Sequence, residues 1–266
     1  LSIGTIAIFG QEINLNERNE TQHIQAPTPT ENENFGHSVK VFGNYLAVGT
    51  DKSENGSVYI YYRNQATGVY ELQKTIDITS GGPGEEDDLY NVDSRFGSFI
   101  EINDKYLAIS ASYYPDGSTN DRGRVYLYKR VGTNWTFLKM WDVNTDFGVT
   151  SAKAQFGRRM SISGDYLIIG SSETGVSNEG SGKVYIFQKN LGGTDNWGHV
   201  KTLAYPGSNN SSVADSFGEE FGFANSMDGD YIVVGARYAR AYDTQPRNGS
   251  GLAFVYYRHQ GGRDQW

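Results

Sequence analysis

Short apolar runs recur along this chain at a nearly constant interval. In one unit, an apolar run at 160–162 and a Tyr-led run at 166–170 are separated by a polar turn. A glycine then opens a third run at 182–187, and a weaker fourth run follows at 197–203. Runs of this length, rich in Val, Ile and Tyr and bounded by Gly, Asn, Asp and Ser, are typical of strands. Each unit therefore predicts four antiparallel strands.

A Phe-Gly pair opens every unit and shows that the chain is a repeat array. The four pairs are Phe35-Gly36, Phe96-Gly97, Phe156-Gly157 and Phe221-Gly222, and the successive Phe residues lie 61, 60 and 65 residues apart. Four strands at this period predict a β-propeller, in which each blade buries both faces against its neighbours. The continuously apolar second and third runs fit a sheet covered on both faces. No window has helical spacing, so we expect no helix.

The repeated motifs resemble the FG-GAP repeats of the integrin α-chain amino-terminal propeller and its bacterial and eukaryotic relatives. The matching features are the Phe-Gly opening, a Gly-Asp-Tyr turn, the Val-Gly-Ala at 234–236, a Gly-x-Val-Tyr strand, and linkers at 192–197 and 261–266. The resemblance covers nearly the whole chain. It implies an all-β fold, a β-propeller of four-stranded antiparallel blades, and suggests seven blades in the full domain. It does not specify a function, because propellers serve many tasks.

We expect one FG-GAP β-propeller segment over residues 1–266, with a half blade at 1–30 and blades at 31–79, 92–142, 152–205 and 217–266. Residues 2–9 align with a third strand and 22–25 with a fourth, while the last unit lacks its fourth strand. These ends predict part of a larger propeller. The alternative is a five-bladed object closed by strand exchange. Two further Phe-Gly pairs, at 147–148 and 217–218, are expected to be turns in the long connections.

Composition narrows the classes of partner. The net charge of −8 argues against nucleic acid and anionic membranes, which favour basic surfaces. No apolar run is long enough for a membrane helix. The absence of Cys excludes disulfides and thiolate metal sites. We expect an extracellular or cell-surface location, and the Asn-x-Ser/Thr patterns that are candidates for glycosylation are Asn19, Asn55, Asn134, Asn209, Asn210 and Asn248.

The turn between the first and second strands bears on metal binding. Integrin-type repeats often insert a calcium loop of the Asp-x-Asp-x-Asp-Gly kind here, but in this chain the turn is two residues long in every unit. The family's metal site therefore does not carry over, and we expect no cofactor. Calcium stays a possibility at Asp116, Asn120 and Asp121, or at the acidic run 85–88.

No catalytic set stands out in the sequence. The four histidines, His23, His37, His199 and His259, lie in different units or turns, without a nucleophile motif. The position after each Phe-Gly pair varies among His37, Ser98, Arg158 and Phe223, which favours a permissive structural position. We therefore expect a protein that is not an enzyme.

Loop length indicates where a partner binds. In an antiparallel blade the second-to-third and fourth-to-first connections lie on one face, and here they include all the long excursions. A scaffold that elaborates one face is typical of a binding surface. Tyr and Arg are enriched at interface hot spots. The candidate ligand-binding residues on this face are Tyr113, Tyr114, Arg237, Tyr238, Arg240, Tyr242, Arg247, Asp87, Asp88 and Tyr90.

The sequence favours a non-enzymatic extracellular binding, adhesion or assembly module that uses the long-loop face. Its expected partners are proteins or other subunits of a surface assembly, with glycans as a further possibility. The alternative is a carbohydrate-binding, lectin-like propeller. A repeated set of one aromatic and one acid in each loop would favour that alternative, and the second-to-third loops share no such set.

Overall fold

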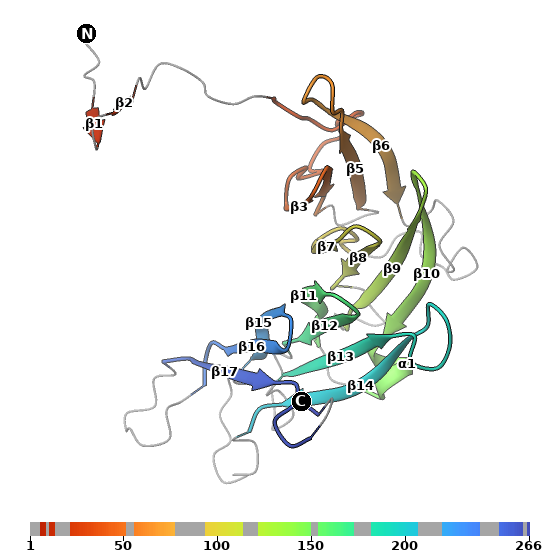
Figure 1. The fold of residues 1–266 in the computed structure, drawn as a ribbon, viewed down its shortest axis with the longest axis vertical. Coiled ribbons are helices and arrows are strands. Elements are labelled where there is room, and N and C mark those ends of the chain that lie inside the picture. The colour runs from red at the N-terminus through yellow and green to blue at the C-terminus, as the bar shows by residue number, and fades with distance from the viewer. Residues whose placement is uncertain are drawn as a thin grey trace.

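A computed structural model shows the chain as a curved row of antiparallel sheets (Figure 1). The structure describes residues 6–8, 11–13, 22–51, 56–77, 94–113, 122–149, 154–172, 182–206, 220–239, 250–262 and 265–266. Three larger sheets have four strands in sequence order, and a fourth sheet has three. This all-β fold of blade-like sheets confirms the predicted fold class.

The strands of each sheet follow one another along the chain, as in a propeller blade. The first blade contains β3 (Ser38–Phe42), β4 (Tyr45–Gly49), β5 (Ser57–Arg63) and β6 (Tyr70–Asp77). The second contains β7 (Ile100–Ile102), β8 (Tyr106–Ala111), β9 (Arg124–Val131) and β10 (Asn134–Asp142). The third contains β11 (Phe156–Ser163), β12 (Tyr166–Ser171), β13 (Lys183–Lys189) and β14 (Trp197–Ala204). The fourth contains β15 (Phe221–Asp228), β16 (Tyr231–Ala236) and β17 (Leu252–Tyr257). In Figure 1 the first strand of each blade lies toward the concave side of the row.

The two-residue turns after the first strands form as predicted. Three of them begin with a glycine of positive φ: Gly43 (56°), Gly164 (57°) and Gly229 (54°). Glycine adopts this conformation without a steric penalty. The second blade has no glycine here, and instead Asn103 Oδ1 accepts hydrogen bonds from the N–H groups of Lys105 (2.9 Å) and Tyr106 (2.7 Å). This side-chain turn replaces the missing glycine.

The Phe-Gly pairs have a structural origin in a tight turn. In each blade the residue after the pair donates its N–H to the carbonyl three residues earlier, as from Arg158 to Gln155 at 3.1 Å. The glycine is the third residue of this turn and has a φ near 90°, which for Gly157 is 90°. A type II turn needs positive φ at that place and therefore favours glycine.

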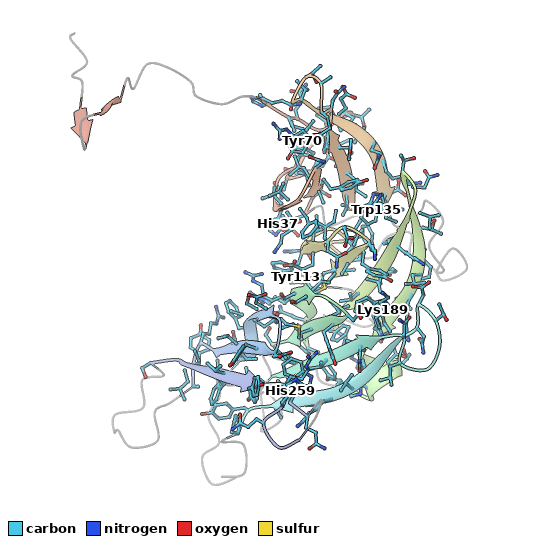
Figure 2. All side chains as sticks on the ribbon, in the orientation of Figure 1. His37, Tyr70, Tyr113, Trp135, Lys189 and His259 are labelled. Atoms are coloured by element: carbon cyan, nitrogen blue, oxygen red, sulfur yellow. The ribbon has the colours of Figure 1, made fainter. Side chains whose placement is uncertain are left out.

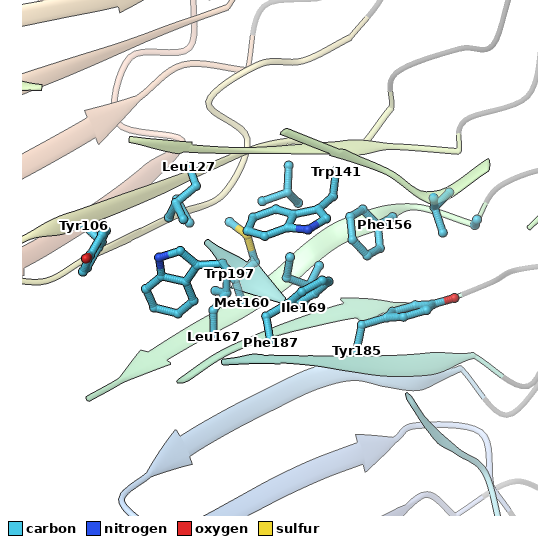
Figure 3. Packing of buried hydrophobic residues seen from close by; sticks show 14 of the residues in the cluster. Tyr106, Leu127, Trp141, Phe156, Met160, Leu167, Ile169, Tyr185, Phe187 and Trp197 are labelled. Carbon is cyan, nitrogen blue, oxygen red and sulfur yellow. The ribbon is translucent and has the colours of Figure 1, made fainter. Parts of the chain in front are cut away.

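The phenylalanine of this turn belongs to the core between blades. Phe96, Phe156 and Phe221 are fully buried, each in an apolar cluster shared with the preceding blade. Figure 3 shows the cluster between the second and third blades, with Phe156 beside Tyr185. Phe96, Phe156 and Phe221 therefore pack between blades. Phe35 is half-buried and packs on Tyr59 of its own blade.

Two further contacts recur wherever one blade meets the next. A Cβ added to the glycine before the third strand would overlap the carbonyl oxygen of the next blade's Phe, as in the pairs Gly56 and Phe96, Gly123 and Phe156, and Gly182 and Phe221. The Tyr that begins the second strand meets the edge of a Trp in the next blade, as in Tyr45–Trp135, Tyr106–Trp197 and Tyr166–Trp266, with ring centroids 5.7, 5.0 and 5.7 Å apart. Backbone approach and an aromatic pair together set the spacing of the blades.

The prediction of no helix is wrong at α1 (Val143–Phe147). Asp142 caps this short helix, because its Oδ1 accepts from the N–H groups of Asn144 and Thr145 at 2.9 and 3.2 Å. Gly148 ends the helix with a φ of 64°. The extra Phe147-Gly148 pair is thus a helix end and not a repeat opening, as expected, and Phe147 packs on Tyr185. The second extra pair, at 217–218, lies outside the described residues.

The expected fourth strand at 22–25 is absent. β1 (Ile6–Ile8) pairs instead with β2 (Gln11–Ile13), which follows it closely in the sequence. Residues 22–35, which we call the strap, run along the first blade. The side chain of Gln22 makes two hydrogen bonds with the backbone of Tyr70. Its Nε2 donates to the Tyr70 carbonyl at 2.8 Å, and its Oε1 accepts from the Tyr70 N–H at 2.7 Å. Ile24 packs on the cluster of Val48, Tyr59 and Tyr61, so the strap covers part of the first blade's free face.

The expectation that the apolar runs are covered on both faces holds only for the inner strands. Every residue of β8 and β12 is buried. The equivalent strand β16 alternates between exposed and buried residues, and so does β17 between exposed and partly buried ones. The reason is that the described residues place another blade on only one face of the fourth sheet.

Candidate binding rim

The residue before each Phe-Gly pair has a strained backbone. The four residues and their φ values are Asn34 (51°), Arg95 (49°), Gln155 (48°) and Glu220 (48°). A left-handed conformation costs an L-residue about 1 kcal/mol, and non-glycine residues that adopt it cluster at functional sites. In each blade the second strand ends beside the start of the first strand, so the residues at these two places lie together. We call this region the rim. It consists of the residue before each Phe-Gly pair, the residue after each pair, and the residues just after β4, β8, β12 and β16.

At the first two blades the rim is a chain of charged and aromatic groups. Asp51 Oδ2 lies 3.5 Å from His37 Nδ1 and 3.6 Å from Arg95 Nη1 of the next blade. The Arg95 guanidinium lies 4.1 Å above the centre of the Tyr113 ring. Figure 2 shows His37 and Tyr113 toward the concave side of the molecule. The two blades are therefore joined at the rim by a carboxylate between two basic side chains.

At the third blade the rim is formed by an arginine held by neutral partners. Arg158 donates from Nη1 to Gln155 Oε1, which also accepts from Ser172 Oγ at 3.3 Å. The Arg158 guanidinium lies 4.8 Å above the ring of Phe223 in the fourth blade. The adjacent Arg159 lies 4.2 Å above the ring of Phe99 in the second blade. Burial, and secondly the charge of Arg158, lower the pKa of Arg159.

At the fourth blade an arginine is clamped by a buried carboxylate. Arg237 Nη2 donates a hydrogen bond to Glu220 Oε1 at 3.0 Å, and its Nε lies 2.5 Å from Oε2, so both carboxylate oxygens lie close to the guanidinium. The same guanidinium lies 4.0 Å above the Phe223 ring and 4.5 Å above the exposed Tyr238 ring. Phe223 thus contacts the guanidinium groups of arginines from two blades.

The rim differs in charge from the chain as a whole. The chain carries a net charge of −8. On the described part of the rim and directly beneath it, the basic groups Arg95, Arg158, Arg159 and Arg237 accompany the carboxylates Asp51 and Glu220. Each cation also lies over an aromatic ring, which keeps its position fixed. The arrangement offers guanidinium groups and ring faces to an anionic partner.

Three of the candidate residues from the sequence lie on the described rim. Tyr113 belongs to the second blade, while Arg237 and Tyr238 lie together in the fourth. The structure does not bring the first of these into contact with the other two, since the third blade lies between them. The remaining candidates, Tyr114, Arg240, Tyr242, Arg247, Asp87, Asp88 and Tyr90, lie outside the described residues.

Sequence reasoning missed several rim residues. Arg95 and Glu220 stand directly before a Phe-Gly pair, and Asp51 follows a second strand. Arg158 and Phe223 follow the pair and were expected to be structural, although their side chains bind across the blade boundary. The signal was available: polar side chains before and after a type II turn that recurs in every unit.

The other sequence candidates have mixed outcomes. The calcium candidates Asp116, Asn120 and Asp121 and the run 85–88 lie outside the described residues. Within the described ranges, no group of three His, Asp or Glu side chains is arranged to hold a metal ion. Of the glycosylation candidates, only Asn134 is described, and it is exposed at the start of β10. No helix in the described part of the chain has the length and apolar character needed to cross a membrane.

A hollow of about 340 Å³ lies at the opposite end of the third and fourth blades, lined by residues that include Asp165, Tyr166, Gln188 and Arg258. Asp230, which also lines the hollow, forms an ion pair with Arg258, with 2.5 Å between Oδ1 and Nη2. His259 Nε2 lies 3.7 Å from the other carboxylate oxygen. Asp165 is likewise paired with Lys189 at 3.2 Å. The carboxylates of this hollow are thus already paired with basic side chains, and the rim is the better candidate for a binding site.

Comparison with known proteins identifies the repeat. The family model described as FG-GAP repeat matches residues 149–187. The match covers β11, β12 and most of β13 in the third blade. No curated protein matches the chain. The third blade is therefore an FG-GAP repeat, and the other three sheets share its strand order and its Phe-Gly turn.

Proposed function

Starting from the FG-GAP repeat that this chain carries, we propose that the protein is a non-catalytic, extracellular binding module that takes an acidic protein segment on its rim. The observation that carries the proposal is the row of arginines over aromatic rings in a chain of net charge −8. Hydrogen bonds between a guanidinium and a carboxylate are among the stronger polar contacts in proteins.

Arg158 is the rim arginine best suited to bind a carboxylate. Its described partners are the neutral Gln155 and the Phe223 ring. Arg95 and Arg237, by contrast, already lie beside Asp51 and Glu220. An acidic side chain that reaches the rim would meet its least neutralised cation at Arg158, with Arg95 and Arg237 on either side along the row of blades. Such a surface attracts anionic partners at a distance in a salt-dependent way.

The lectin-like alternative has less support. A sugar site in each blade would repeat one aromatic and one acid at equivalent positions. The equivalent rim pairs instead are His37 with Asp51, Ser98 with Ser112, and Phe223 with Arg237. These pairs share no common chemistry, and a rim that varies from blade to blade is suited to one extended partner.

The proposal is tested with a labelled glutamate-rich decapeptide that contains one tyrosine, and with the matching glutamine-rich peptide. Fluorescence anisotropy at low and physiological salt measures both affinities. The glutamate peptide is expected to bind more tightly, and Arg158→Gln to weaken it by about 5- to 30-fold, the loss of one charge-assisted contact. Arg130→Gln is the control, because Arg130 bonds Asp104 and Gly132 carbonyls at the other end of the second blade.

Equal affinity for the two peptides, or an equal loss in Arg158→Gln and Arg130→Gln, would refute an acidic partner on the rim. A glycan array on which one sugar binds and competes with neither peptide would favour the lectin-like function. Turnover of a glycoside, ester or phosphate substrate that a point change in the rim abolishes would contradict the non-catalytic assignment.

A further inference from the structure

The third blade contributes two arginines side by side at the rim. Arg158 and Arg159, which we call the arginine pair, are consecutive residues of β11, and both are partly buried. The register of β11 against β12 shifts between Phe156 and Arg159, so the strand is bulged at Arg158. A bulge changes the direction of a side chain. Arg159 Nη1 donates a hydrogen bond to the Arg158 carbonyl at 2.9 Å, so the second guanidinium lies beside the backbone of the first residue.

Uncharged partners hold both guanidinium groups in the described structure. Arg158 donates to Oε1 of the buried Gln155, and its guanidinium lies 4.8 Å from the centre of the Phe223 ring. The Arg159 guanidinium lies 4.2 Å from the centre of the Phe99 ring. Burial, and secondly the charge of Arg158, lower the pKa of Arg159, which is the effect of close like charges. An anion that faces both groups would therefore stabilise them.

Other partly buried arginines have acidic partners from within the chain. Arg124 Nε lies 2.6 Å from Asp142 Oδ2 in the second blade. Arg237 is bound by Glu220 in the fourth blade. The arginine pair differs from these in its neutral partners, so its two charges are the ones that the rim can offer to another molecule.

The two rings beside the arginine pair connect it to the neighbouring blades. Phe223 also contacts the Arg237 guanidinium at 4.0 Å, and Phe99 meets the edge of His37 with ring centroids 6.3 Å apart. Cations and rings from all four blades therefore form one run along the rim, and Figure 2 shows its first member, His37, toward the concave side. A segment that follows this run passes over the arginine pair.

The number of oxygens and charges distinguishes the groups that fit two guanidiniums. A carboxylate has two oxygens and one charge, which one arginine fork can satisfy. A phosphate monoester has three acceptor oxygens and a charge of about −1.5 to −2 at pH 7. A sulfate ester has the same three oxygens and one charge. Three oxygens can accept from two guanidiniums at once, and arginine forks match this geometry.

We propose that the arginine pair binds a phosphate or sulfate ester on a side chain of the partner segment, an inference that rests on the acidic-segment function proposed above. Arg158 and Arg159 both donate to the ester oxygens. The Phe99 and Phe223 rings keep the two guanidiniums in position.

The test uses the whole 266-residue chain and the same glutamate-rich decapeptide, with its tyrosine unmodified, phosphorylated or sulfated. Fluorescence anisotropy at physiological salt measures the gain in affinity that each ester gives over the unmodified peptide. A gain of about tenfold or more is expected, the effect of one added charge-assisted contact or more. The ester with the larger gain is the one that the site prefers.

Variants assign the gain to the arginine pair. Arg158→Gln and Arg159→Gln are each expected to remove most of it, whereas Arg159→Lys, which keeps the charge and loses the fork, should keep part of it. Arg130→Gln at the other end of the second blade should keep all of it. Circular dichroism and the thermal transition establish that each variant is folded.

The ester site is refuted if neither ester raises the affinity of the wild type, or if both glutamine variants of the arginine pair keep the full gain. The glutamine-rich peptide with the same esters separates this result from the proposed function. If glutamates add no affinity but the esters still do, the acidic-segment function fails and the ester site stands. If glutamates add affinity and the esters add none, the ester site fails and the acidic-segment function stands.

Discussion

The third and fourth blades have the same strand order and the same Tyr-led second strand, but their burial differs. Ile168 and Ile186 of the third blade have no solvent exposure, whereas the equivalent Val233 and Val255 are largely open to solvent. The sequence pattern is common to both, and only the neighbouring blade distinguishes them. An apolar run in such an array therefore encodes a contact surface, and whether the surface is buried depends on what lies beside it.

The largest expected difference comes from the glycines before the third strand. Gly182→Ala should destabilise the protein by more than about 3 kcal/mol, because the new Cβ overlaps the Phe221 backbone. Gly251→Ala has nearly the same φ but no second blade beside it, so only backbone strain of about 1–2 kcal/mol is expected. Urea denaturation of both variants measures the difference. Equal losses would mean that the third and fourth blades do not differ in this contact.

A core truncation is expected to have the next largest effect. Ile186→Ala removes methyl groups from a sealed core and should cost about 2–5 kcal/mol. Val255→Ala at the equivalent exposed position should change the free energy of unfolding by less than about 0.5 kcal/mol. Thermal and urea unfolding provide the measurement. A large loss at Val255 would show that the fourth sheet is covered within a single molecule.

The tyrosines at the start of the second strands give a smaller difference. Tyr106 donates its hydroxyl to Asp195 at 3.1 Å while its ring meets Trp197. Tyr106→Phe keeps the ring and should lose about 1 kcal/mol. Tyr231→Phe in the fourth blade should lose less than about 0.3 kcal/mol, because the contact of Tyr231 in the described structure is that of its ring with Tyr257, which phenylalanine keeps. Denaturant midpoints measure both losses, and similar losses would count against a stabilising hydrogen bond between Tyr106 and Asp195.

The smallest effect concerns the ion pair between the first two blades. Burial raises the pKa of Glu101 above its ordinary value of 4.5, and Lys40, 2.6 Å away, partly opposes that rise. The folded state therefore holds this proton more tightly than the unfolded state, so stability falls as the pH rises from 4.5 through the folded pKa. Glu101→Gln should remove this fall in stability with rising pH. Lys40→Met should raise the folded-state pKa of Glu101 further, so the fall should continue to higher pH. Free energies of unfolding at half-unit steps of pH measure this slope. An unchanged slope in Glu101→Gln would show that Glu101 is not the cause of the pH dependence.

Much of the fold could be predicted because it is local and repeated. The two-residue turns at Gly43 and Gly164 and the burial of Phe156 follow from residue types at fixed spacing. The helix at Val143–Phe147 was not predicted, because five residues are too few to show a helical spacing of apolar side chains. Its N-terminus is stabilised by the Asp142 cap. The exposure of Val255 could not be predicted, because its own sheet does not determine what covers it.

The candidate site was predictable only in part. Loop length directed attention to the end of the blades where the rim lies and to Tyr113, Arg237 and Tyr238. It missed Arg95 and Glu220, because it followed loop length and not the polar residues that precede each Phe-Gly turn. The contacts across blade boundaries, such as Arg158 over Phe223, became visible only when both blades were placed together.

The close approach of the Phe221 backbone to Gly182 has a consequence for how such a protein can change. The spacing of the blades depends on a glycine, a carbonyl and an aromatic ring, none of which belongs to the rim. Substitutions at Asn34, Arg95, Gln155 or Glu220 therefore change the side chains of the rim and leave the glycine, carbonyl and ring that space the blades in place. Exchange of one blade for another with the same turn and a different rim residue is a way to vary the rim by recombining units, in a laboratory library as in natural duplication.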